Sequence, residues 1–365
     1  MSDVILNLLP LAPGEKEEFE AIAPNAQHIY TGRRKVTPEE IEKATVIFGW
    51  PRARDVANAK NLKWFQTMWA GSDEYLDFMP EGATLTSSTG SNRRSVAEHM
   101  FACTLSLCRR LPAYRDSQRA HVWEDEGAMK TLLDATVLVV GAGNIGSTYA
   151  DMCRKLGAKT IGLKRTASPV EGFDEVYSVD KLDELIPQAD VVALIMPHNP
   201  QSVGLMNEAR INAMKDDAIL ISSGRGSVLD QDALVRAMQS GKLWGAALDV
   251  TEPEPLPADH PLWDIPNLLL TPHVAGGMRL EITRRACIHM AQDNLKRYLK
   301  GEKLKNLVIE GKYAAFCVGA GVLDGPKRIR KIQRGVGDAA PYYIRTNKKT
   351  GCAVRTLFSY LFTWA

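Results

Sequence analysis

Arg225 is a residue whose type and setting point to ligand chemistry. It lies between Gly224 and Gly226, directly after the apolar run 218–222, which is typical of a buried strand. Open parallel sheets bind ligands at the carboxyl ends of their strands, and flanking glycines would free the backbone to aim the guanidinium group. Because the planar donors of arginine match a carboxylate or a polarised carbonyl, Arg225 is a candidate substrate-binding residue. An arginine met alone would more often be a surface ion-pair residue.

A glycine-rich loop follows the predicted strand 136–140 and precedes a predicted helix over residues 147–156. In this strand-turn-helix setting the pattern GxGxxG permits a tight turn, close approach of a pyrophosphate and close packing of the helix. The helix N-terminus then faces the phosphate charge. The residues expected to contact a dinucleotide here are Gly141, Gly143, Asn144, Ile145 and Gly146.

The next predicted strand, 160–163, ends in Lys164, Arg165 and Thr166. An NAD-preferring site usually has a carboxylate here that accepts hydrogen bonds from the ribose hydroxyls, and this chain has none. Two cations and a hydroxyl suit the 2′-phosphate of NADP instead. The sequence therefore predicts NADP(H) as the preferred cofactor and NAD(H) as the second. The alternative is that Lys164 and Arg165 are solvated loop charges.

Two further predicted strands end in proline-rich or glycine-rich loops, within the segments 245–257 and 268–277. The joint occurrence of GAGNIG, SGRG, ALDVTEPEP and TPHVAGG closely resembles the D-isomer-specific 2-hydroxyacid dehydrogenase family, over about residues 61–307. The resemblance implies a nicotinamide-dependent oxidoreductase that interconverts a small 2-oxo acid and its 2-hydroxy acid. It also implies a homodimer.

The resemblance assigns roles to single residues. Arg225 matches the arginine that holds the substrate, His273 the catalytic acid-base, and Glu254 the carboxylate paired with that histidine. Asp249 matches the residue that holds the nicotinamide carboxamide, and His273 also borders the cofactor. The loop whose N–H groups receive the substrate carboxylate corresponds to Ala70 and Gly71.

These residue types suit the implied reaction. Hydride addition to a ketone carbon leaves an alkoxide, so a proton donor that works near neutral pH must reach the oxygen, and histidine meets that need. Glu254 would stabilise the protonated ring of His273, and Arg225 would stabilise negative charge developing on the oxygen. In the oxidation direction the neutral imidazole takes the hydroxyl proton.

Some positions depart from the family pattern. In the loop after the predicted strand 191–195, Pro197 and Ser202 are expected to border the cofactor, with Ser202 in place of a common threonine. His198 of that loop is expected to be a wall of the cofactor site. Met278 and Arg279 stand where small residues or threonine are common, which leaves the substrate open.

Trp50, with residues 68–69, is a candidate wall of the substrate pocket, and simple core packing is the alternative. Such a wall would fit a bulky apolar 2-oxo acid, or it would crowd the pocket so that only glyoxylate or hydroxypyruvate enters.

Short apolar runs alternate with amphipathic stretches through the first 300 residues, which predicts an α/β protein with a Rossmann-type, doubly wound parallel sheet. Apolar residues between 95 and 121 predict a long helix halted by Pro112. A cofactor domain over residues 96–274 would leave 1–95 and 275–312 to form a discontinuous, flavodoxin-like substrate domain. Strands are predicted over 4–9, 45–49, 64–68, 136–140, 160–163, 191–195, 218–222, 245–250 and 268–270.

The composition is that of a globular protein long enough for two cores: 365 residues, 45% hydrophobic and 24% charged. The net charge is +2, but residues 314–365 hold nine Lys or Arg against two Asp, so the body is mildly acidic. We expect no nucleic-acid or membrane partner and no metal site. The six cysteines form no CxxC pair, which favours reduced thiols in a cytoplasmic protein.

The basic segment 313–365 lies beyond the resemblance, and three interpretations remain: a disordered appendage, a localisation or nucleic-acid patch, and a segment foreign to the fold. Two rival functions also remain. One is a corepressor-like protein that binds the cofactor without turnover, and the other is oxidation of formate or phosphite.

Overall fold

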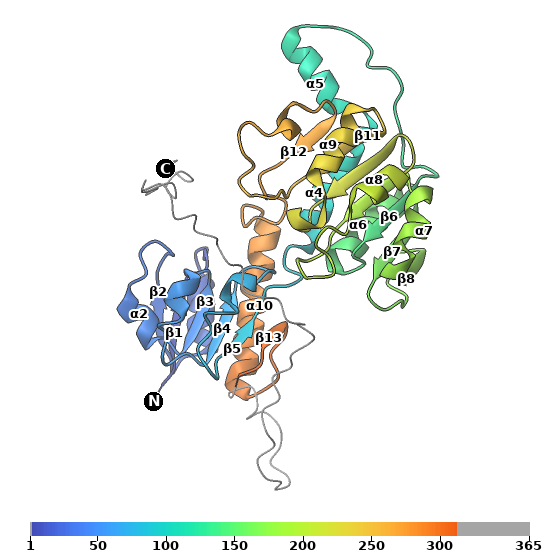
Figure 1. Cartoon of the computed structure of the whole chain (residues 1–365). Coiled ribbons are helices and arrows are strands. Elements are labelled where there is room, and N and C mark those ends of the chain that lie inside the picture. The colour runs from blue at the N-terminus through green and yellow to red at the C-terminus, as the bar shows by residue number, and fades with distance from the viewer. Residues whose placement is uncertain (1, 312–365) are drawn as a thin grey trace, which may run out of the picture. The chain divides into compact units, whose positions relative to one another are not determined.

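The computed structural model describes residues 2–311, which form two β-sheets with helices on both faces of each (Figure 1). The predicted appendage 313–365 lies outside these residues. The first sheet has the order β13-β5-β4-β3-β1-β2 and contains β1 (Val4–Asn7), β2 (Gln27–Tyr30), β3 (Val46–Gly49), β4 (Trp64–Thr67), β5 (Thr84–Thr86) and β13 (Leu307–Ile309). The second has the order β12-β11-β10-β9-β6-β7-β8 and contains β6 (Thr136–Val140), β7 (Lys159–Lys164), β8 (Glu175–Ser178), β9 (Val191–Leu194), β10 (Ala218–Ser222), β11 (Leu243–Leu248) and β12 (Leu268–Leu270).

The second sheet is parallel throughout, as the predicted Rossmann class requires. The chain runs outward from β6 to β7 and β8, and then returns to place β9 on the other side of β6. A crevice for a ligand opens where the strand order reverses in this way. The loops after β6 and β9, which begin at Gly141 and Ile195, therefore flank the expected cofactor site.

Both faces of this sheet are buried, which explains why its strands are short, nearly continuous apolar runs. Val137 and Val139 of β6 pack with α4 (Arg93–Cys108) and α6 (Asn144–Lys155). Leu138 and Val140, which point the other way, pack with the helices of the opposite face. Those helices are α7 (Leu182–Leu185), α8 (Glu208–Ala213) and α9 (Gln231–Gln239).

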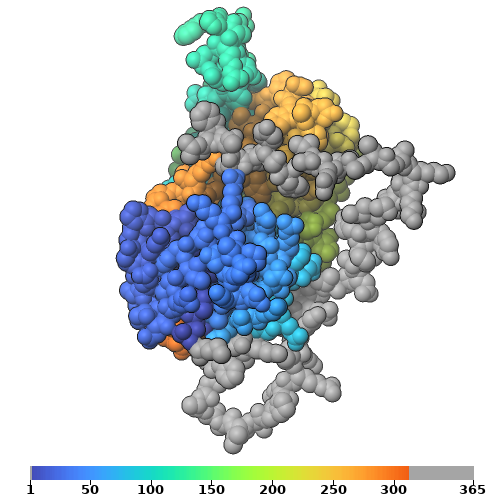
Figure 2. Space-filling model, turned by 90° about the vertical axis from the view of Figure 1, so that its left-hand side faces the viewer, coloured from blue at the N-terminus to red at the C-terminus, as the bar shows by residue number. Residues whose placement is uncertain are grey.

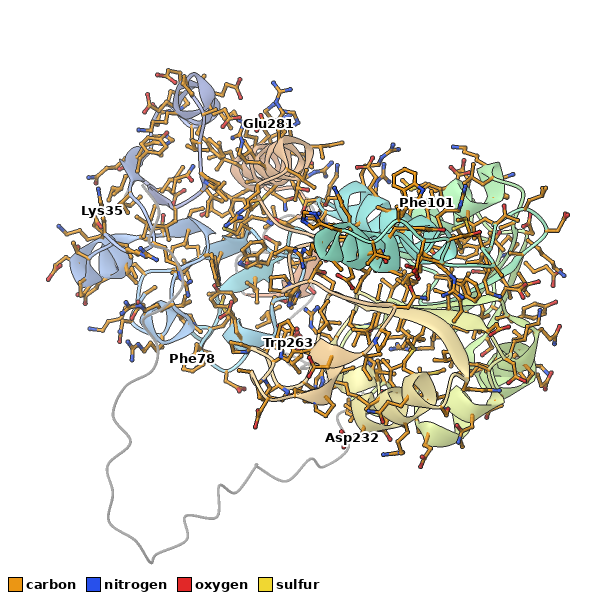
Figure 3. The ribbon with its side chains drawn as sticks, turned by 90° about the horizontal axis from the view of Figure 1, so that it is seen from above. Lys35, Phe78, Phe101, Asp232, Trp263 and Glu281 are labelled. Atoms are coloured by element: carbon orange, nitrogen blue, oxygen red, sulfur yellow. The ribbon has the colours of Figure 1, made fainter. Side chains whose placement is uncertain are left out.

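The first sheet is built from both ends of the described chain, because β13 pairs antiparallel with β5. On one face, α1 (Glu15–Ile22) and α10 (Glu281–Lys300) cover Phe48 and Trp64. On the other face, α2 (Pro38–Lys43) and α3 (Ala53–Val56) cover Ile47 and Phe65. Figure 3 labels Glu281, where α10 begins. The domain limits predicted at residues 95 and 275 remain a prediction.

The long helix expected between residues 95 and 121 is two helices, so that expectation was wrong in its detail. Helix α4 ends at Cys108, and α5 (Leu111–Ala120) begins after Arg110, whose φ of 52° is left-handed. Pro112 lies in the first turn of α5, where its missing N–H has no helical acceptor to lose, so it starts a helix instead of halting one.

All predicted strands are present, and the structure adds β2, β5, β8 and β13. Among residues 2–311, no helix is both long enough and apolar enough to cross a bilayer. Cys103, Cys108, Cys153 and Cys287 are buried free thiols.

Candidate active site

Arg225 follows β10 in an extended conformation, and its Nη1 donates to the carbonyl of Gly224 over 2.9 Å. The flanking glycines are needed for a reason other than conformational freedom, because neither has a positive φ. A Cβ at Gly224 would meet the carbonyl oxygen of Met196 at 2.5 Å, and one at Gly226 would collide with the backbone of Thr251. Close backbone packing thus explains both glycines, which corrects the expectation from the sequence.

The guanidinium of Arg225 lies against the loop predicted to bind the substrate carboxylate. A Cβ built on Gly71 would lie 2.5 Å from Nη2 of Arg225, so only a glycine fits there without a shift. Ala70 and Gly71 follow β4, in the first sheet, whereas Arg225 follows β10, in the second. The structure therefore places Gly71 and Arg225, which are both expected to bind the substrate carboxylate, next to each other.

His273 and Glu254 form the predicted pair. Nδ1 of His273 lies 2.9 Å from Oε2 of Glu254, and the two side chains are 48% and 39% exposed. The other acidic residue of that loop, Glu252, donates its backbone N–H to Oε1 of Gln231, and its carbonyl accepts from Nε2 of Gln231. The choice of Glu254 over Glu252 agrees with this geometry. His273 has a φ of 50°, a left-handed value that few non-glycine residues adopt.

Asp249 holds the loop that carries His273. Its buried carboxylate accepts hydrogen bonds from the hydroxyl of Thr271 at 2.6 Å and from the N–H groups of Val274 and Ala275 at 2.9 and 3.0 Å. Its own carbonyl accepts from the N–H of His273 at 2.8 Å. The contact of Asp249 with the nicotinamide amide remains a prediction. The structure shows that this carboxylate also holds the loop that carries His273.

The loop after β9 is stabilised from within. The buried hydroxyl of Ser202 donates to the carbonyl of Pro197 at 2.6 Å and accepts from the N–H of Asn199. His198 points its Nδ1 at the hydroxyl of Ser227, 2.8 Å away. Ser202 thus shapes the loop, and the cofactor contacts predicted for Pro197 and Ser202 remain predictions.

The glycine loop fits a dinucleotide, as the space around each glycine indicates. Gly141 has a φ of 120°, and a Cβ there would lie 2.6 Å from the carbonyl oxygen of Ile195, while one at Gly146 would collide with Gly141. The protein itself requires these two glycines. A Cβ at Gly143 would meet nothing within 4 Å, so its open space faces away from the protein. That is where the backbone approaches a pyrophosphate.

The start of α6 is also prepared for an anion. Its N-cap is Gly143, which has no side chain to accept from the first N–H groups, and the first helical hydrogen bond comes from Ser147. The N–H groups of Asn144, Ile145 and Gly146 therefore lack an acceptor within their own helix. Together with the helix dipole they suit a phosphate group.

Lys164 is the last residue of β7, and Arg165 and Thr166 follow it directly, as predicted. Nζ of Lys164 donates to the hydroxyl of Ser168 at 3.1 Å, while Arg165 and Thr166 are exposed. Among residues 2–311, neither Lys164 nor Arg165 forms an ion pair with a carboxylate. Both cations are available to a ligand.

Trp50 belongs to an aromatic cluster next to the carboxylate loop. Its ring packs edge-to-face on Trp69 at 5.2 Å, and the guanidinium of Arg33 lies 3.6 Å above it. Its Nε1 donates to Glu74 over 2.8 Å. Met278, from the loop after His273, packs against the same core cluster as Trp50 and Trp69.

One residue near the site, His99, was missed by sequence reasoning. His99 of α4 lies 3.1 Å from the hydroxyl of Thr271 and 3.9 Å from the carboxylate of Asp249. A single histidine within a helix forms no sequence motif. Nothing in the sequence indicates that His99 contacts Thr271, which lies two residues before His273. Within residues 2–311 no group of His, Cys, Asp and Glu could hold a metal ion.

Residues 101–275 match the model of the NAD-binding domain of D-isomer specific 2-hydroxyacid dehydrogenases. The chain is 31% identical to the human glyoxylate reductase/hydroxypyruvate reductase, over 69% of this chain and 78% of that protein. It is 32% identical to the chloroplastic/mitochondrial formate dehydrogenase of Arabidopsis thaliana, over 68% of this chain and 66% of that one.

Solved structures give the same result over nearly the whole described chain. A D-isomer specific 2-hydroxyacid dehydrogenase family protein from Aeromonas salmonicida matches with a TM-score of 0.76 and 30% identity, covering 85% of this chain and 99% of that one. A relative from Xanthobacter autotrophicus Py2, in complex with NADPH and MES, matches with a TM-score of 0.71 and 27% identity, covering 85% and 99%.

The fold and the site are those of a nicotinamide-dependent oxidoreductase that acts on the CH–OH group of hydroxy acids. The chain belongs to the D-isomer specific 2-hydroxyacid dehydrogenase family.

Proposed function

We propose that this protein is an NADPH-preferring reductase of small 2-oxo acids, with Arg225, Glu254 and His273 as its chemical residues. The observation that carries the proposal is the pairing of His273 with Glu254 at 2.9 Å, together with the packing of Arg225 against Gly71. A proton donor and a carboxylate-binding arginine are what reduction of a 2-oxo acid requires.

Each residue acts at a stated atom. The N–H groups of Ala70 and Gly71 and the guanidinium of Arg225 bind the substrate carboxylate and orient its carbonyl. Bound NADPH supplies the hydride for the carbonyl carbon. His273, held at Nδ1 by Glu254, gives the proton on Nε2 to the carbonyl oxygen, and Arg225 stabilises the charge that develops there.

The cofactor preference rests on Lys164, Arg165 and Thr166, which the structure leaves available at the end of β7. Charge-assisted hydrogen bonds to a 2′-phosphate are stronger than neutral ones. The NADPH complex of the Xanthobacter relative supports the same preference. NADH is the second, weaker cofactor.

The substrate is proposed to be small because the pocket wall is filled. Trp50 and Trp69 pack on each other, and Met278 packs on the same core cluster, so bulky side chains gather near the carboxylate loop. Glyoxylate and hydroxypyruvate fit such a pocket better than a bulky apolar 2-oxo acid. The name of the human relative agrees with this choice.

A homodimer is proposed, with the segment 111–133 as part of the subunit contact. Helix α5 buries none of its residues, and Figure 2 shows this segment, in teal, standing clear of its neighbours. Several exposed apolar side chains within one segment are a feature of protein interaction sites. The exposed apolar residues of the segment are Leu111, Val122, Trp123, Met129 and Leu133.

The free thiols accord with the cytoplasmic location predicted for the protein.

The test is a panel of 2-oxo acids, with glyoxylate, hydroxypyruvate, pyruvate and phenylpyruvate, assayed with NADPH and with NADH. We expect the largest kcat/KM for the two smallest polar substrates with NADPH. Turnover of none of them, with NADPH bound normally, would favour a corepressor-like protein and overturn the proposal. Oxidation of formate would instead favour the rival function, oxidation of formate or phosphite.

A further inference from the structure

His99 enters the active-site region from a helix that the reaction does not otherwise use. Helix α4 packs on β10 and β11, and this places the half-buried imidazole of His99 beside the loop that follows β12. Nε2 of His99 lies 3.1 Å from Oγ1 of Thr271, although 172 residues separate the two in the sequence. The contact therefore exists only because of the tertiary fold.

The direction of the hydrogen bonds is fixed by what each group can donate. Asp249 is acceptor-only when ionised, so the hydroxyl of Thr271 must donate to it over their 2.6 Å contact. The same hydroxyl then has only lone pairs left for His99, so Nε2 of His99 carries the hydrogen. Cys103, whose Sγ lies 3.6 Å from the same nitrogen, is neutral at pH 7 because burial raises the pKa of its thiol to about 11. The chain of donation runs from His99 to Thr271 to Asp249.

This series of hydrogen bonds ends at the backbone of His273 and of the two residues that follow it. Asp249 accepts from the N–H groups of Val274 and Ala275 through its carboxylate, and from the N–H of His273 through its carbonyl. His273 itself has a φ of 50°, a strained conformation that persists only where the surroundings over-determine it. The hydrogen bonds to Asp249 hold His273 in this conformation, and the hydrogen bond from Thr271 orients the carboxylate of Asp249.

We propose that His99 is a positioning residue for His273. It orients the hydroxyl of Thr271, which fixes the carboxylate of Asp249, and Asp249 holds the strained loop so that His273 faces Glu254 in its working geometry. The proposal rests on the proposed reductase function, in which His273 is the proton donor.

The test compares His99→Leu with His99→Gln, because the amide nitrogen of glutamine can donate from nearly the place of Nε2 and leucine cannot donate. We expect His99→Leu to lower kcat about tenfold, as loss of one orienting hydrogen bond would, with KM for the 2-oxo acid and the dissociation constant of NADPH within about twofold. His99→Gln should recover most of kcat. A merely structural role would lower the melting temperature and leave kcat of the folded enzyme unchanged.

A second variant and a second measurement separate this proposal from the proposed function. Thr271→Val removes the middle hydroxyl and should give the same loss of kcat, and the double variant should lose no more than either single one. Amide hydrogen exchange at Val274 and Ala275, measured without substrate, should speed up in His99→Leu and not in His99→Gln. If the parent reduces no 2-oxo acid, the function fails while the exchange result still tests the positioning. If the parent is active and both His99→Leu and Thr271→Val keep full kcat, the positioning proposal is wrong.

Discussion

Nδ1 of His273 is bound to Oε2 of Glu254 at 2.9 Å, which leaves Nε2 as the ring nitrogen that can exchange a proton with a substrate. The carboxylate fixes both the orientation of the ring and the nitrogen at which protonation matters. Both side chains remain about half exposed, so a substrate can reach the pair.

Removal of the proton donor should abolish most of the activity. His273→Ala should lower kcat for reduction by about 10² to 10⁴, the usual cost of losing an acid-base group, and Arg225→Ala should be similarly damaging through lost carboxylate binding. Neither residue belongs to the glycine loop, so NADPH titration should give dissociation constants close to that of the parent. Near-normal turnover in His273→Ala would refute the mechanism.

Glu254→Gln should have a milder effect than His273→Ala. The amide can still accept from Nδ1 of His273, but it places no negative charge beside the ring, so kcat for reduction should fall by less than in His273→Ala. Steady-state kinetics of the two variants measure the difference. An unchanged kcat in Glu254→Gln would assign Glu254 a structural role only.

The cofactor preference should depend on Lys164. Charged hydrogen bonds of about 1.5 to 3 kcal/mol to the 2′-phosphate predict a tenfold to few-hundredfold preference for NADPH, reduced by solvent screening and by added salt. Lys164→Asp should move the preference toward NADH, since it removes a phosphate partner and adds a ribose acceptor. The ratio of kcat/KM for the two cofactors is the measurement. Equal values in the parent would contradict the prediction.

The stability of the first sheet should depend on pH through Glu15. Arg284 of α10 donates to both oxygens of Glu15, at 2.6 and 2.9 Å, and this hydrogen bond is the main cause that holds the pKa of Glu15 below 4.5. A lowered pKa in the folded state contributes stability above the unfolded value, and this contribution is lost as pH falls through the folded value. Glu15→Gln should therefore lower the free energy of unfolding by about 1 to 3 kcal/mol at pH 7, and by progressively less below pH 4.5.

Urea unfolding of Glu15→Gln and of the control Glu281→Gln, at pH 7 and at pH 4, tests this dependence. Glu281 binds the same arginine from the solvent side, with its side chain 61% exposed, so its loss should cost less. An equal cost for Glu15→Gln at both pH values would show that the ion pair does not contribute.

The oligomeric state should depend on Trp123. Its side chain is fully exposed in the isolated chain, and a tryptophan buried at a subunit contact commonly contributes about 2 kcal/mol or more. Trp123→Ser should therefore raise the dissociation constant of the dimer by about thirtyfold or more, as sedimentation velocity would show. Trp263→Ser is the matched control, because Trp263 is also exposed but lies elsewhere, on the short helix η5 (Pro261–Asp264) (Figure 3). A parent that is monomeric at all concentrations would end the dimer proposal.

The central strands could be predicted from the sequence because burial on both faces makes them continuous apolar runs, as in β6 and β10. The missed strands β2, β8 and β13 lie at sheet edges, where partial exposure breaks the apolar pattern. β5 is only three residues long and carries two buried threonines. The break between α4 and α5 depends on one left-handed residue, Arg110, which no periodicity reveals.

The residues of the candidate site also differ in whether the sequence alone reveals them. Arg225, Glu254 and His273 lie in loops whose composition marks them in the sequence. His99 does not, because its partner Thr271 is brought to it only by the packing of α4 against the sheet. The reason for Gly224 and Gly226 also required the structure, since only the folded backbone shows what would collide with a side chain there.

The open space beside Gly143 makes it a position where ligand binding and folding can be uncoupled. The methyl group of an alanine there would meet no atom within 4 Å beyond its own residue and its chain neighbours, yet it would occupy volume needed by a pyrophosphate. Gly141 and Gly146 offer no such choice, because a side chain at either one collides with the backbone itself. Gly143→Ala would thus yield a natively folded protein that does not bind its cofactor. The affinity for the acid substrate could then be measured without bound cofactor.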